Sequence, residues 1–159
     1  MKEYSHLFTE DEPEYQAAKA FESRVRDVTE FLATLGLTAP LKPNHSRVTY
    51  QDSCHLLHGQ KIREAPRQLL RAIPELKFVE LPYSDICCGS AGIYNVTQTE
   101  AALELLQEKV DCAKSTGASI IATANPGCLL QIRAGAEIHH TGQEVLHVIE
   151  LLDRAMRKA

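Results

Sequence analysis

A strand that leads directly into a helix is indicated by Ala118-Ser119-Ile120-Ile121-Ala122-Thr123-Ala124-Asn125-Pro126-Gly127-Cys128. The first seven residues are small and apolar, which suits a strand buried on both faces. Asn125 is a favourable helix N-cap, and Pro126 fits the first position of a helix. The sequence therefore predicts a strand, a short turn and a helix, with Cys128 in the first turn of that helix.

The same order of strand, loop and helix recurs towards the N-terminus. Residues 47–51 and 77–82 contain the β-branched and aromatic residues typical of strands, and each run precedes a loop and then a helix signal. Residues 65–73 are one such helix, which begins with Pro66 in its first turn. Alternating strands and helices predict one α/β domain in which helices flank a mainly parallel sheet in three layers.

The N-terminal region is predicted to be helical. Apolar residues from Pro13 to Leu35 recur at spacings of three and four, which indicates one amphipathic helix that ends at Gly36. Residues 38–45 contain two prolines and are interpreted as a linker. The predicted division is an N-terminal helix and linker over residues 1–45 and a cysteine-rich domain over residues 46–159.

Two further helices are predicted in the C-terminal half. Thr97-Gln98-Thr99-Glu100 has the pattern of a capping box, and Thr116-Gly117 supplies a left-handed stop for the helix between them. The tail from Glu144 to Arg157 is interpreted as helical, since its apolar residues recur at helical spacing.

Composition excludes several classes of protein. The 159 residues are 44% apolar and 24% charged, and the net charge of -4 comes from scattered charges without a basic stripe for nucleic acid. No apolar run reaches the roughly 18 residues of a membrane span, and the first residues lack a secretion signal. The five cysteines are an odd number in a chain large enough to fold without disulfides, so a reducing compartment is expected.

Four cysteines follow predicted strands, and the carboxyl ends of parallel strands meet at one edge of a sheet. They are Cys54, Cys87, Cys88 and Cys128. Four thiolates suit zinc or an iron–sulfur cluster, and Gly89 lets the backbone approach an inorganic core. The alternative is that these cysteines are buried hydrophobic side chains. Cys112 lies within a predicted helix and is interpreted as a structural or surface thiol.

Neighbouring polar residues are weaker candidates for the same site. His55 and His58 are candidates for ligands or for hydrogen-bond donors to the ligands, and Gly89 and Asn125 are candidates for groups that surround the ligands. Asp52 is interpreted as a cap or turn residue. A disulfide between Cys87 and Cys88 would close a strained ring, so it is not expected.

These motifs resemble those of the cysteine-rich CCG domain family. The resemblance is carried by Gln51-Asp52-Ser53-Cys54-His55-Leu56, Cys87-Cys88-Gly89-Ser90-Ala91-Gly92 and Asn125-Pro126-Gly127-Cys128, and extends from about Tyr50 to the C-terminal tail. It is greatest for the branch of glycolate oxidase iron–sulfur subunits, which is related to a subunit of heterodisulfide reductase and to iron–sulfur proteins of lactate oxidation.

The resemblance implies a set of ligands and a cofactor. Cys54, Cys87, Cys88 and Cys128 match the metal-binding cysteines of the family, with an iron–sulfur cluster of the 4Fe-4S type as the expected cofactor and zinc as the alternative. The fullest family motif ends in a CxxC pair whose first position is Asn125 here. Four ligands remain, which suit an ordinary cluster or zinc rather than the multi-iron cluster of the heterodisulfide reductase branch.

The resemblance also implies a role in electron transfer. The expected function is that of an iron–sulfur subunit, or a fragment of one, in a glycolate oxidase-like complex that oxidises 2-hydroxy acids. Its expected partners are a flavin-containing subunit and the ferredoxin-like and first CCG regions of relatives, with self-association as a further expectation. Such a chain is expected in the cytoplasm or at the inner face of the membrane, without activity of its own.

Two other functions remain open at this point. Zinc could serve only as a structural metal that holds the loops together, in a non-redox module that docks a partner subunit. A thiol–disulfide enzyme using Cys87 and Cys88 ranks lower, because the sequence has no Cys-x-x-Cys motif.

Overall fold

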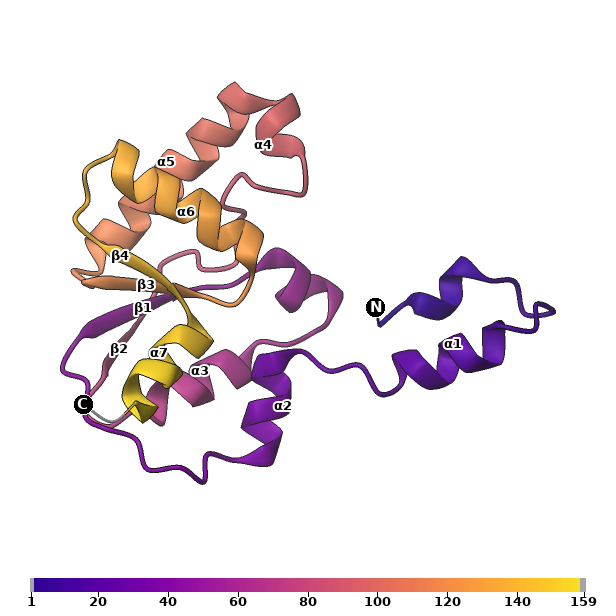
Figure 1. The fold of residues 1–159 in the computed structure, drawn as a ribbon. Coiled ribbons are helices and arrows are strands. Elements are labelled where there is room, and N and C mark those ends of the chain that lie inside the picture. The colour runs from indigo at the N-terminus through magenta and orange to yellow at the C-terminus, as the bar shows by residue number, and fades with distance from the viewer. Residues whose placement is uncertain (1, 158–159) are drawn as a thin grey trace.

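A computed structural model describes residues 2–157 of the chain, and in it four parallel strands form one sheet in the order β2-β1-β3-β4 (Figure 1). The strands are β1 (Arg47–Gln51), β2 (Lys77–Glu80), β3 (Ile120–Thr123) and β4 (Glu144–His147). Thr49 pairs with Val79 on one side and with Ile121 on the other, and Ile121 pairs with Val145. The predicted parallel α/β fold is confirmed.

Helices cover both faces of the sheet, so the domain has the three layers expected (Figure 1). The helical elements are η1 (Tyr4–Leu7), α1 (Tyr15–Glu22), α2 (Val28–Leu35), η2 (His55–Gly59), α3 (Glu64–Arg71), α4 (Tyr94–Thr97), α5 (Thr99–Ser115), α6 (Pro126–Ile138) and α7 (Val148–Met156). Helices α5 and α6 lie on one face, and α3 and α7 on the other. Among the described helices, none has the length and apolar character needed to cross a bilayer.

Alternate residues of each strand supply the two halves of the core. Val48 and Tyr50 are almost fully buried in the cluster that includes α3 and α7. Ile121 and Val145 belong to a second cluster under α6, which also contains Cys88 and Cys128. Cys88 and Cys128 are therefore part of the packed interior on the α5–α6 face, whereas Cys54 and Cys87 are only partly buried.

The prediction of one helix from Pro13 to Leu35 is wrong. The chain forms α1 and α2 with a break between them, because Asp27 and Glu30 make a capping box that starts a new helix. The apolar period continues through the break, so periodicity alone could not locate it. Gly36 does end α2, with a φ of 78°.

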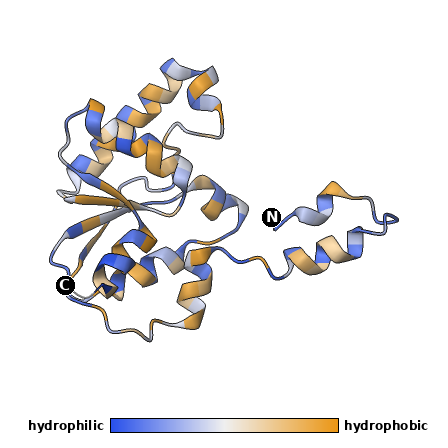
Figure 2. Cartoon of the chain, viewed as in Figure 1, coloured by the Kyte–Doolittle hydropathy of each residue, from blue (hydrophilic) through white to orange (hydrophobic). Residues whose placement is uncertain are grey.

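Helix α2 packs against the rest of the domain, whereas η1 and α1 lie beside each other and apart from the sheet (Figure 1). Leu32 and Leu37 contact the cluster that contains α3 and α7. Figure 2 shows hydrophobic residues along both α1 and α2. Their exposed members include Phe21 and Phe31.

Two other sequence predictions are corrected. Residues 144–147 form β4, and the predicted helix in the tail begins only at Val148. Four residues are too few for periodicity to distinguish a strand from a helical turn. The capping box at Thr97–Glu100 does not form either, because Thr97 is already in α4 and α5 begins without a side-chain cap. The stop at Gly117 is confirmed by its φ of 64°.

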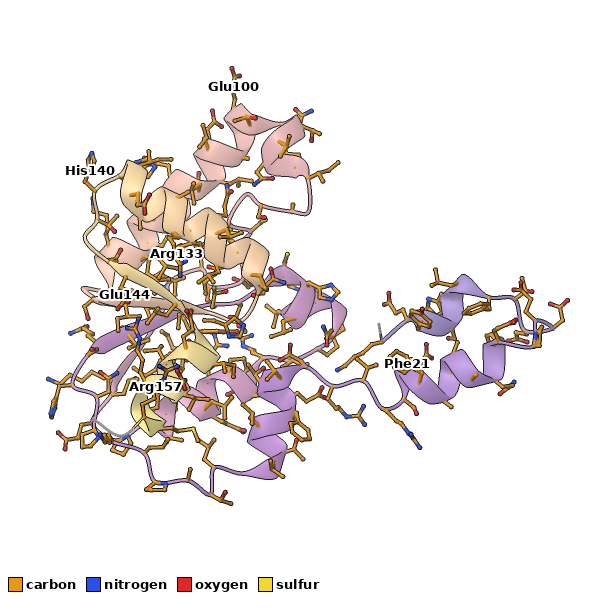
Figure 3. All side chains as sticks on the ribbon, viewed as in Figure 1. Phe21, Glu100, Arg133, His140, Glu144 and Arg157 are labelled. Atoms are coloured by element: carbon orange, nitrogen blue, oxygen red, sulfur yellow. The ribbon has the colours of Figure 1, made fainter. Side chains whose placement is uncertain are left out.

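Strand β4 forms one edge of the sheet, and side chains bind two of its outward-facing backbone groups. The Glu144 N–H donates inward to Ser119, so the groups of the next residue point outward. The Val145 carbonyl accepts a hydrogen bond of 2.8 Å from the guanidinium of Arg133 on α6 (Figure 3). The His147 N–H donates to the Glu150 carboxylate at 2.7 Å. Two polar groups of the edge are therefore already paired within the domain.

Candidate metal centre

Four cysteines lie beyond the carboxyl ends of three neighbouring strands. Cys54 follows β1, Cys87 and Cys88 lie in the loop after β2, and Cys128 is in the first turn of α6, directly after β3. Since β2, β1 and β3 are adjacent and parallel, these positions share one edge of the sheet. The predicted gathering of cysteine-bearing loops at one edge matches the topology.

The position of Cys128 is fixed by the start of α6. The side-chain oxygen of Asn125 accepts hydrogen bonds from the N–H groups of Gly127 at 2.9 Å and Cys128 at 3.3 Å. Pro126 occupies the first turn, as predicted. Asn125 therefore orients the backbone that carries Cys128.

Only glycine fits at position 89, directly after the cysteine pair. Gly89 has a φ of +88°, and a Cβ placed there would lie 2.4 Å from the carbonyl oxygen of Ala102 on α5. Gly127 faces the same loop, because its Cβ would lie 3.3 Å from the Ser90 hydroxyl. The loop after the cysteine pair therefore packs closely against the backbone of α5 and against the start of α6.

Polar groups favour the thiolate form at the four sulfurs. The Gly89 N–H donates to the Cys87 sulfur at 3.3 Å. The backbone N–H groups of His55 and Ser90 act to lower the pKa of Cys54 and Cys88, and the Ser53 hydroxyl acts to lower that of Cys128. N–H groups directed at sulfur stabilise thiolates and iron–sulfur clusters, so this donor set fits a thiolate-ligated cofactor.

Cys88 and Cys128 lie in one buried cluster and influence each other's ionisation. The Cys128 thiol donates to the Cys88 sulfur, and this hydrogen bond outweighs burial and lowers the pKa of Cys88 to about 6. The same hydrogen bond, together with burial, raises the pKa of Cys128. Burial, assisted by the charge of Cys87, also raises the pKa of Cys54. Without a cofactor, Cys88 is therefore the thiol of this pair that ionises first.

We expect the ionisation of Cys88 in the metal-free protein to depend on pH in a way that reports this hydrogen bond. The ultraviolet absorption of its thiolate should fall as pH is lowered through about 6. In the urea-unfolded chain the fall should instead centre on a pH of about 8.5. The difference between the absorption of the wild type and that of Cys88→Ser measures both titrations. Identical profiles for the folded and unfolded chains would contradict the assignment.

The other candidate residues lie outside the three cysteine-bearing loops or are exposed. Cys112 lies in α5, where it is half-buried and packs against the cluster that contains Cys88 and Cys128. His55 and His58 are exposed in the short π-helix η2. Among residues 2–157, no group of three or more His, Cys, Asp or Glu side chains is arranged to hold a metal ion. The four-cysteine site therefore stays a prediction about the loaded protein.

The structure contains a buried ion pair next to the cysteine loops that the sequence did not predict. Asp52 is not simply a turn residue, because both its oxygens accept hydrogen bonds of 2.7 Å from the guanidinium of Arg67 on α3. Burial alone would raise the pKa of Asp52, but the bonds from Arg67 and Ser84 hold it below its ordinary value. Fifteen residues separate the two partners, and no sequence pattern indicates such a pairing.

Comparison with known proteins gives consistent matches. The profile of the cysteine-rich domain family named CCG matches residues 48–133, which include all four cysteines. The chain is 38% identical over 161 residues to the probable glycolate oxidase iron-sulfur subunit of Bacillus subtilis strain 168, a match that covers 96% of this chain. It is 31% identical over 153 residues to lactate utilization protein A of the same strain, again over 96% of this chain.

A third relative is part of a reductase. One subunit of the fumarate reductase (CoM/CoB) of Methanothermobacter marburgensis is 38% identical over 135 residues, or 84% of this chain. The chain spans 35% of the length of the glycolate oxidase relative, 64% of the lactate utilization protein and 28% of the fumarate reductase relative. The similarity thus concerns one part of each of these longer proteins.

Proposed function

We propose, from the premise that this chain belongs to the CCG family of cysteine-rich domains, that it is an electron-transfer module carrying an iron–sulfur cluster. Its proposed ligands are Cys54, Cys87, Cys88 and Cys128, and the proposed cluster is of the 4Fe-4S type. The proposed setting is a glycolate oxidase-like complex that oxidises 2-hydroxy acids. Two of the relatives carry names that fit this setting, an iron-sulfur subunit and a lactate utilization protein.

One observation carries the proposal. Cysteines from three separate loops lie at one edge of the sheet, and the Gly89 N–H donates to the Cys87 sulfur at 3.3 Å. A cysteine that only filled space would not need a backbone N–H directed at its sulfur. A bound cluster would supply one-electron chemistry. The protein's part is to hold four thiolates, to donate hydrogen bonds to them and to limit the access of water.

Anaerobic reconstitution tests the cofactor. The chain should take up roughly four iron and four sulfide ions and become coloured, and the colour should fade on reduction with dithionite. Iron, zinc and acid-labile sulfide are then measured per chain. Binding of zinc alone, without visible absorption, would contradict the proposal and favour a metal-stapled docking module.

Exposed apolar side chains beside the cysteine edge support the proposal that this surface binds a partner subunit. Ile93 and Val96 in and near α4 and Leu130 in α6 are all exposed, and a hydrogen bond of 3.0 Å between Asn95 and Gln131 ties these helices together. We propose that a flavin-containing subunit delivers electrons on this side. The proposed location is the cytoplasm, including the inner surface of the membrane, where a quinone acceptor is within reach.

The isolated chain is expected to be inactive towards glycolate. Under the proposed role it relays electrons and does not itself remove a hydride, a step that requires an organic cofactor on another subunit. Reduction of a dye by glycolate is measured with the reconstituted chain, and dithionite-reduced chain is the control for electron transfer to the dye. Turnover of glycolate by the chain alone would contradict the proposal that another subunit oxidises the substrate and this chain only relays electrons.

A further inference from the structure

Residues 83–86 form a turn directly before the cysteine pair, and three of its four carbonyl groups are held by donors from other elements. The ammonium of Lys109 on α5 donates to the Tyr83 carbonyl at 2.6 Å. The N–H of Asp52 donates to the Ser84 carbonyl at 3.1 Å, and the side-chain amide of Gln51 donates to the Ile86 carbonyl at 3.1 Å. We call residues 83–86 the 83–86 turn.

The 83–86 turn is also bonded to the loop that carries Cys54. The Ser84 hydroxyl donates at 2.7 Å to the Asp52 carboxylate, which also accepts a hydrogen bond from the guanidinium of Arg67. Gln51 and Asp52 precede Cys54 by three and two residues in the chain. The loops that bring Cys54 and Cys87 to the sheet edge are therefore bonded to each other before any metal is considered.

Lys109 is the unusual member of this network. Its side chain is almost entirely buried, on the same face of α5 as Ala102 and Ala113. Ala102 touches the backbone at Gly89, and Ala113 belongs to the apolar cluster of Cys88. The lysine thus lies on the part of α5 that packs against the cysteine loop.

No carboxylate forms a salt bridge with Lys109 in the part of the chain that the structure describes. Burial lowers the pKa of this lysine, while Cys112, Cys88, Asp85 and Cys87 act in the opposite direction. Buried lysines without a carboxylate are rare, because the charge loses its hydration. The nearby groups that can supply a compensating negative charge are Asp85 and the thiolates of the neighbouring cysteines.

Tyr83 shows why the turn needs support. Its φ of 52° lies in the left-handed region, which is unfavourable for a residue with a side chain. The tyrosine ring is exposed, so ring packing does not hold this conformation. The Tyr83 carbonyl, in contrast, accepts from both Lys109 and the Ile86 N–H.

We propose that Lys109 is a positioning residue for the candidate metal centre. It fixes the 83–86 turn, so that Cys87 and Cys88 are presented to Cys54 and Cys128, and it places a positive charge beside their thiolates. The role of Lys109 in cluster binding rests on the proposed function. The contacts that carry it belong to the metal-free chain, so they can be tested separately.

The test compares variants by hydrogen exchange and by spectroscopy. Lys109→Met keeps a long side chain but removes the charge and the donor, and Lys109→Arg restores both. Ser84→Ala breaks the bond to Asp52 without changing any charge. Arg154→Met is the control, since it removes an exposed ion pair with Glu144 in the C-terminal part of the domain. Amide exchange is followed by mass spectrometry on the metal-free chain, and electron paramagnetic resonance on the reconstituted and reduced chain.

In Lys109→Met, amides of residues 83–90 should exchange about tenfold faster, as expected for the loss of one buried hydrogen bond, while those of β3 stay unchanged. Ser84→Ala should have a smaller effect in the same segment, and Lys109→Arg should recover most of the protection. The cluster of Lys109→Met should be bound less fully and give a shifted resonance spectrum. Arg154→Met should match the wild type.

Three outcomes separate the inference from the proposed function. Unchanged exchange over residues 83–90 in Lys109→Met, or faster exchange spread evenly over the chain, would overturn the positioning role. A wild type that binds a cluster while all variants share its spectrum would also overturn it and leave the proposed function standing. A wild type that binds no cluster, with the local exchange effect present, would overturn the proposed function and leave the positioning of the cysteine pair supported.

Discussion

Replacing Arg67 by Met is expected to lower the free energy of unfolding by about 3–5 kcal/mol, the usual cost of removing one partner from a buried ion pair. Only 3% of the Arg67 side chain and 2% of the Asp52 side chain are exposed. The substitution leaves the Asp52 carboxylate without its two shortest N–H donors. Urea or guanidinium unfolding followed by circular dichroism measures the loss.

Arg154→Met is the matched control for this measurement. Arg154 also binds a carboxylate with two hydrogen bonds, to Glu144 at 2.9 and 2.6 Å, but about half of each side chain is exposed. Exposed pairs contribute about 1 kcal/mol or less. Equal effects of the two substitutions would contradict the view that burial makes the Arg67 pair important.

The ion pair also predicts how stability responds to acid. The pKa of Asp52 is lowered in the folded protein, so its contribution is present above the unfolded pKa of about 3.9 and is lost as pH falls through the lower folded value. In Arg67→Met the same carboxyl is buried without its partner, and its pKa should rise. The variant should therefore lose less stability than the wild type when the pH is lowered from 5 to 3.

Replacing Cys88 by Ser is expected to abolish binding of the cluster, and Cys87→Ser should do the same. A hydroxyl does not ionise to a soft ligand at neutral pH, so iron keeps at most three thiolates. Iron and sulfide per chain should drop to background, and the visible absorption should disappear. The loops at the sheet edge should also become more open to protease, because metal binding contributes to folding energy.

Cys112→Ser provides the control for cysteine chemistry in general. This residue lies on α5 and belongs to none of the three loops at the sheet edge. Its replacement should leave iron, sulfide and colour at the wild-type level. Equal iron contents in Cys87→Ser, Cys88→Ser and Cys112→Ser would end the assignment of the site.

The architecture could be predicted where sequence signals are local and strong. The apolar run before Asn125-Pro126 predicted β3 and the start of α6 because N-cap chemistry acts within a few residues. The break between α1 and α2 and the four-residue strand β4 were not predicted, because the spacing of apolar residues is equally consistent with a continuous helix in both places.

For the candidate site, the sequence predicted the positions of the cysteines but not what surrounds them. Parallel topology places strand ends at one edge, so Cys54, Cys87 and Cys128 could be grouped from the strand pattern. The partners Arg67 and Lys109 come from helices far along the chain. Neither composition nor spacing predicts contacts between such distant positions, and only the packed structure shows them.

The paired backbone groups of β4 limit how folded molecules can aggregate. An open sheet edge is a template on which a second chain can add a strand and start a fibril. Here Arg133 occupies the Val145 carbonyl and Glu150 occupies the His147 N–H, so an incoming strand would have to displace both. Fibril growth from the folded domain is therefore disfavoured at the β4 edge.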